Sequence, residues 1–184
     1  MACLTIPDTN EHFKSANDIQ AYLKPHGIWY ERWNVERGVP ANAPAEAILA
    51  AYALEIDVLK QCGGYVTADV IDVTPELPGL QEMLDRFNKE HTHAEDEVRF
   101  IVSGSGIFHI HPATGPVFGI QLEAGDLINV PAGTRHWFDL CSTRTIRAIR
   151  LFREKSGWAP LYVGSGVHEK YQPICFGPQY VAAK

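Results

Sequence analysis

The sequence has no apolar run long enough to cross a membrane. Its longest runs, such as residues 47–54, are flanked by Glu46 and Glu55 and fall far short of the roughly 20 residues that a spanning helix needs. The first residues also lack the basic start of a secretory signal, and Asp8 and Glu11 follow soon after. We therefore expect a cytoplasmic protein that makes no contact with a membrane.

Cysteine and clustered basic charge are also scarce. The four cysteines, Cys3, Cys62, Cys141 and Cys175, lie far apart without a CxxC pair, so we expect free thiols and no zinc knuckle. The formal net charge is -6, and no basic run is longer than two residues. Such a chain would repel a polyanion, so we expect no nucleic-acid partner.

The composition is that of an ordinary folded protein. Apolar residues make up 46% and charged residues 21% of the 184 residues, which argues against long disorder. A chain of this length commonly forms one domain. We expect a single domain over residues 1–184, with a metal-binding barrel core at about residues 65–155, active as a monomer.

The first half of the sequence predicts helices and strands in mixed order. Ser15 resembles a helix cap, and Pro25 with Gly27 ends the helix that follows. Apolar spacing predicts one long amphipathic helix from Pro44 to Gly63-Gly64 and a short one over residues 80–87. Aromatic and β-branched residues predict strands over the ranges 28–35 and 65–73.

From His91 onward, short extended runs alternate with glycine and proline. We expect strands over residues 97–102, 107–111, 117–122, 127–130 and 145–152, the first two separated by Gly104-Ser105-Gly106. Strands at this spacing predict an antiparallel sandwich or barrel. The tail, residues 157–184, has little periodicity and is expected to be ordered coil on the barrel surface.

Three histidines and one glutamate form the strongest candidate site. His91 and His93 are two residues apart, so in an extended chain both imidazoles project from one face. Glu97 follows across a polar stretch, and His136 comes after two tight turns that can return it to the first pair. Imidazole suits iron, nickel, copper and zinc alike, so these ligand types predict a metal without choosing it.

These residues resemble the two motifs of the cupin superfamily. The first, HxHxxxE followed by glycine, is matched by residues 91–97 with Gly104, and the second, GDxxxxPxGxxH, by residues 125–136. The resemblance implies a mainly β (α+β) fold, the cupin double-stranded β-helix or jelly-roll barrel, with the amino-terminal helices packed outside. It also implies that His91, His93, Glu97 and His136 bind one metal ion.

A narrower resemblance points to the acireductone dioxygenase family of methionine salvage. It rests on segments 29–33, 96–102, 136–139 and 149–152 and on Gly157-Trp158. The family implies Fe2+ or Ni2+, one per chain, and cleavage of 1,2-dihydroxy-3-keto-5-methylthiopentene with O2. The iron form is expected to give formate and 4-methylthio-2-oxobutanoate, and the nickel form carbon monoxide, formate and 3-methylthiopropanoate.

Four further side chains are candidates for the same site. Arg99 and Arg150 occupy strand positions that could face the metal and stabilise charge on the substrate, so we expect them to be catalytic. Phe138 and Trp158 are expected to line the substrate. The alternatives are salt bridges for the arginines and core packing for the aromatic rings.

Two other interpretations of the sequence stay open at this stage. A second HxH, His109 and His111, lacks a following acid, and we expect it to be packing or surface residues. The chain could also be another cupin metalloenzyme, a different dioxygenase or a sugar isomerase. A further hypothesis is a cupin that binds a ligand without enzymatic activity, and this hypothesis predicts no O2 uptake.

Overall fold

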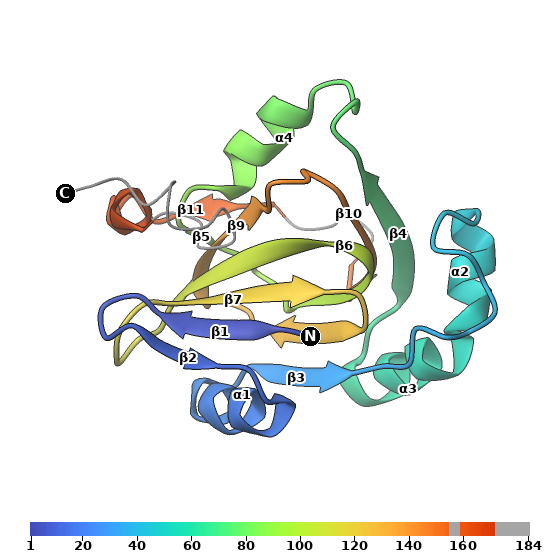
Figure 1. The fold of residues 1–184 in the computed structure, drawn as a ribbon, viewed down its shortest axis with the longest axis horizontal. Coiled ribbons are helices and arrows are strands. Elements are labelled where there is room, and N and C mark those ends of the chain that lie inside the picture. Colours follow the sequence, from blue (N-terminus) through green and yellow to red (C-terminus); the bar gives the residue numbers. More distant parts are fainter. Residues whose placement is uncertain (155–158, 172–184) are drawn as a thin grey trace.

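Two antiparallel sheets that share one long strand dominate the structure (Figure 1), a computed structural model that describes residues 1–154 and 159–171. The shared strand is β6 (Glu97–His111). The first sheet contains, in spatial order, β11 (Leu161–Tyr162), β5 (His91–Thr92), β9 (Arg135–Leu140), β6, β7 (Phe118–Glu123), β1 (Cys3–Ile6) and β2 (Glu11–Phe13). The second contains β4 (Thr67–Val73), β10 (Ile146–Phe152), β6, β8 (Asp126–Val130) and β3 (Trp29–Arg32).

The prediction that β6 would be two strands is wrong. Its amino-terminal half pairs with β8 and β10, and its carboxy-terminal half pairs with β7 and β9. Gly104 adopts a φ of 75°, and a Cβ there would lie 2.1 Å from the carbonyl oxygen of Thr145. The glycines therefore let the strand bend closely past its neighbours without ending it.

The helices lie outside the strands (Figure 1). Helix α1 (Ala16–Leu23) begins as predicted, since the Ser15 hydroxyl accepts a hydrogen bond from the backbone N–H of Asp18. It continues into the 3-10 helix η1 (Lys24–His26), which ends at Gly27 in the left-handed conformation. Helix α4 (Leu80–Phe87) also matches the prediction. Among the described residues, no helix has both the length and the apolar character needed to span a bilayer.

The single long helix predicted from Pro44 onward is two helices. Helix α2 (Ala45–Ala51) and helix α3 (Ala53–Gly63) meet at Tyr52, whose φ of -111° is not helical. The Tyr52 ring is buried, with its centroid 4.7 Å from that of Phe100 and 6.2 Å from that of Trp33. Packing of this ring on the second sheet accounts for a break that helical periodicity cannot indicate.

The tail differs in part from the expected coil. Its described residues include β11, which pairs with β5, and the short 3-10 helix η2 (Val167–Lys170). Residues 155–158 and 172–184, with Trp158 and Cys175, lie outside the described residues. The short strands β1 and β2 were not predicted either, because runs of four and three residues carry little periodicity.

The aspartate of the second motif, Asp126, ties β3 to β8. Its buried carboxylate accepts hydrogen bonds from the Tyr30 hydroxyl (2.8 Å), the Arg32 guanidinium and the backbone N–H of Glu123 (2.8 Å). One side chain thus satisfies three donors at the start of β8. Asp126 therefore has a structural role in this chain.

Asp126→Ala should lower the free energy of unfolding by about 3 kcal/mol, because the buried donors lose a charged acceptor. Urea denaturation followed by circular dichroism measures the change. Asp57→Ala, at an exposed position of α3, is the matched control and should change it by less than about 0.5 kcal/mol. Equal effects of the two substitutions would contradict this role.

Candidate metal centre

Three buried histidines converge on one point between β5, β9 and the turn before β6. His91 is the register partner of His136, and their ring centroids lie 4.5 Å apart. The His93 ring lies 4.8 Å from that of His91 and 5.1 Å from that of His136. One nitrogen from each ring lies within 4.8 Å of the others, which is close enough for all three to bind one ion.

Each of these rings is oriented by a backbone carbonyl that accepts a hydrogen bond from its Nδ1 atom. The pairs are His91 with Lys89 (2.6 Å), His93 with Ala159 (3.0 Å) and His136 with Thr134 (2.8 Å). A carbonyl can only accept, so Nδ1 carries the proton, and in a neutral ring Nε2 keeps its lone pair. This is the arrangement found for histidines that bind metals through Nε2.

The environment of His91 fits a metal ligand. Its Nε2 atom is buried and has no hydrogen-bond partner among the described residues. Burial, together with the neighbouring His136, lowers the pKa of His91 to about 4, so the ring is neutral at pH 7. A buried nitrogen lone pair without a donor is costly unless a cation takes it, so the residues present fit a bound ion.

Glu97, the first residue of β6, adds a carboxylate at the same point. Its Oε2 atom lies 2.9 Å from His136 Nε2 and 3.2 Å from His93 Nε2, while Oε1 accepts a hydrogen bond from Arg99 Nε at 2.6 Å. Burial alone would raise the pKa of Glu97. The positive charge of Arg99, with the nearby His136 and His93, outweighs this effect and holds the pKa of Glu97 well below its usual value.

The two predicted arginines are neighbours across the second sheet. Arg99 of β6 is the register partner of Arg150 of β10, and both line a small cavity together with Phe138. The Arg99 guanidinium lies 4.9 Å from the centre of the Phe138 ring. Arg150 also forms a bidentate ion pair with Asp69, at 2.8 and 2.6 Å. The remaining cavity wall is apolar and includes residues of α4.

A second group of residues, which no sequence pattern indicated, holds this centre in place. Glu90, buried next to His91, accepts a hydrogen bond from His111 Nδ1 at 2.5 Å and one from the Ser165 hydroxyl. Its backbone carbonyl accepts from the N–H of Val163 at 3.2 Å. Glu90 therefore holds the segment around residues 159–165 in place. The carbonyl of Ala159 in this segment accepts the hydrogen bond from His93. This link is visible only in the three-dimensional structure, because Glu90 and Ser165 are 75 positions apart in the sequence.

The second HxH pair lies apart from the three converging histidines. His109 is buried and stacks on Trp137, with ring centroids 4.9 Å apart and planes at 7°. His111 is bonded to Glu90, as described above. Among the described residues, the group of side chains that could hold a metal comprises His91, His93 and His136, and neither of these two belongs to it.

Several known proteins are similar to this chain over most of its length. The model of the ARD/ARD' family matches residues 5–160. The chain is 43% identical to the acireductone dioxygenase of Picosynechococcus sp. over 156 residues, which cover 85% of this chain and 89% of that protein. It is 40% identical to that of Exiguobacterium sibiricum over 171 residues, which cover 88% and 95% of the two chains.

A solved structure is similar over most of the chain. It is the acireductone dioxygenase from Bacillus anthracis with a cadmium ion in its active centre, which superposes with a TM-score of 0.83 at 39% identity. The match covers 88% of this chain and 98% of that one. The predicted cupin fold is thereby confirmed, although its sheets form an open barrel. The chain belongs to the acireductone dioxygenase (ARD/ARD') family.

Proposed function

We propose that this protein is a metal-dependent dioxygenase that cleaves the acireductone 1,2-dihydroxy-3-keto-5-methylthiopentene with O2 in methionine salvage. One observation carries the proposal: the buried Nε2 atoms of three histidines meet the ionised carboxylate of Glu97 at one point. Family membership over most of the chain supports the choice of substrate. All four side chains belong to one polypeptide, which supports activity as a monomer.

The proposed cofactor is one Fe2+ or Ni2+ per chain, held by His91, His93, Glu97 and His136. When bound, the ion would supply the Lewis acidity that holds the deprotonated enediol and makes it reactive toward O2. Three neutral imidazoles and one carboxylate leave a divalent site with a net charge of +1. Such a site favours an anionic substrate over a neutral one.

The surrounding side chains have separate proposed roles. Arg99 keeps Glu97 ionised and presents a buried positive charge beside it. Arg150 lines the small cavity that Arg99 and Phe138 also line, and it would stabilise negative charge that develops on substrate oxygens. Phe138 and the apolar wall would exclude water from the reacting carbons. Trp158 remains a predicted part of the substrate wall.

His91→Ala, His93→Ala and His136→Ala should each remove most of the bound metal. Each substitution deletes one of the four proposed ligands, and the three that remain bind the ion more weakly. Elemental analysis of protein reconstituted with Ni2+ measures the content, with about one ion expected for the wild type. His109→Ala is the matched control, since it removes a buried imidazole outside the group. Equal losses from His109→Ala would contradict the assignment.

Glu90→Gln should weaken Ni2+ binding about tenfold, because loosening of the segment beyond residue 159 frees the His93 ring. Calorimetric titration of the metal-free protein gives the dissociation constant. Ser165→Ala removes the hydroxyl that donates to Glu90, so it should also weaken Ni2+ binding. Unchanged affinity in both variants would show that this link does not position His93.

Arg150→Ala should lower kcat/KM about ten- to hundredfold while metal content stays near one per chain, because the side chain acts on substrate charge. Steady-state O2 consumption and elemental analysis separate the two effects. Asp69→Asn removes the ion pair but keeps the guanidinium, so it should retain most activity. Equal loss of activity in both variants would assign Arg150 to a structural ion pair.

The bound metal should decide the products. Reconstitution with Fe2+ should give formate and 4-methylthio-2-oxobutanoate, whereas Ni2+ should give carbon monoxide, formate and 3-methylthiopropanoate from the same substrate. Gas chromatography detects the carbon monoxide, and mass spectrometry distinguishes the two acids. If neither metal supports O2 uptake, the dioxygenase proposal is wrong, whatever the metal content.

A further inference from the structure

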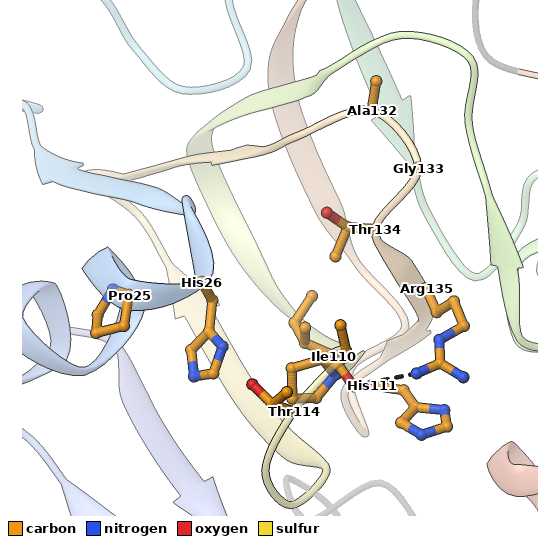
Figure 2. A pocket seen from close by; sticks show the side chains of 11 residues that line it. Pro25, His26, Ile110, His111, Thr114, Ala132, Gly133, Thr134 and Arg135 are labelled. Atoms are coloured by element: carbon orange, nitrogen blue, oxygen red, sulfur yellow. Dashed lines mark hydrogen bonds between the residues drawn. The ribbon is translucent and has the colours of Figure 1, made fainter.

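A second cavity lies outside the metal centre, on the other side of the turn between β8 and β9. Its walls come from three segments that are distant in the sequence: η1, the loop after β6 and this turn (Figure 2). Its volume is about 340 Å³, which is within the range of small-molecule sites. Nothing in the proposed dioxygenase reaction uses it.

The ionisable side chains among the described residues that line this cavity are all basic. The chain has 22 acidic residues and a formal net charge of -6, yet no aspartate or glutamate is among the described residues that line the cavity. Its polar groups are the guanidinium of Arg135, the imidazoles of His26 and His111 and the hydroxyls of Thr114 and Thr134 (Figure 2). One fixed cation with neighbouring donors suits an anion.

Arg135 is already held in place for such a contact. Its Nη2 atom donates a hydrogen bond to the carbonyl oxygen of Pro112 at 3.1 Å, seen as the dashed line in Figure 2. A guanidinium has five N–H donors, so this bond fixes the group and leaves donors for a ligand. The nearby carboxylate of Glu90 is buried and accepts hydrogen bonds from Ser165 and His111, which together with the charge of Arg135 lower its pKa.

We propose that this cavity binds a small oxyanion, a carboxylate or phosphate group, with Arg135 as its charged partner and His26 on the opposite wall. The same turn also touches the metal centre. The Thr134 carbonyl accepts from His136 Nδ1, and the N–H of Gly133 donates to the carbonyl of His93 at 2.9 Å. A bound anion would therefore contact the turn that orients two of the candidate ligands.

The test is an NMR titration of the cadmium-loaded full chain with inorganic phosphate and, separately, with pyruvate, so that the two oxyanion sources are compared. We expect saturable shifts of the backbone amides of residues 113–114 and 133–135. Arg135→Gln should raise the dissociation constant about tenfold, as expected for loss of one charge-assisted contact. His26→Ala, from a different segment, should also weaken binding, while Arg144→Gln, the matched control, should leave it unchanged.

Cadmium content is measured for every variant, because Arg135 precedes a candidate ligand. Weaker binding in Arg135→Gln and His26→Ala at full metal content would support the site, and the tighter of the two anions would identify its chemistry. Absence of saturable binding for both anions would overturn the proposal. So would shifts centred on residues 91–97, or equal affinity in the wild type and both cavity variants.

Discussion

The site depends on one constraint, namely that three imidazoles keep their Nδ1 protons on backbone carbonyls and direct their Nε2 lone pairs to one buried point. Two of these carbonyls belong to the residue two positions before the histidine, so the extended backbone sets both ring orientations locally. The third, from Ala159, comes from 66 residues further along the chain. The metal centre is therefore complete only when the tail is in place.

The fold supplies the positions from which these side chains meet. Strand β6 carries Glu97 and Arg99 at its start and runs on through both sheets, so the carboxylate is fixed to the most extensively paired strand. Strand β5 has only two residues and is held between β9 and β11. A short strand of this kind depends on its neighbours and on Glu90, which joins the barrel to the tail beside the site.

Much of this arrangement could be predicted from the sequence, and the rest follows from contacts that no local pattern encodes. The spacing of His91 and His93 indicated one shared face, because alternation along an extended chain is local. The break at Tyr52 and the continuity of β6 through Gly104 depend instead on rings and strands that pack from elsewhere in the chain. The same holds for the link from Glu90 to Ser165, whose residues are 75 positions apart.

The most direct test of the account is a crystal structure of the nickel-loaded protein with anomalous diffraction collected at the nickel edge. The account predicts one strong peak per chain about 2.0 to 2.2 Å from the Nε2 atoms of the three histidines and from a carboxylate oxygen of Glu97. The Nδ1 bonds to the carbonyls of Lys89, Thr134 and Ala159 should persist. A peak bound through Nδ1 atoms, or one that excludes Glu97 from the ligands, would contradict it.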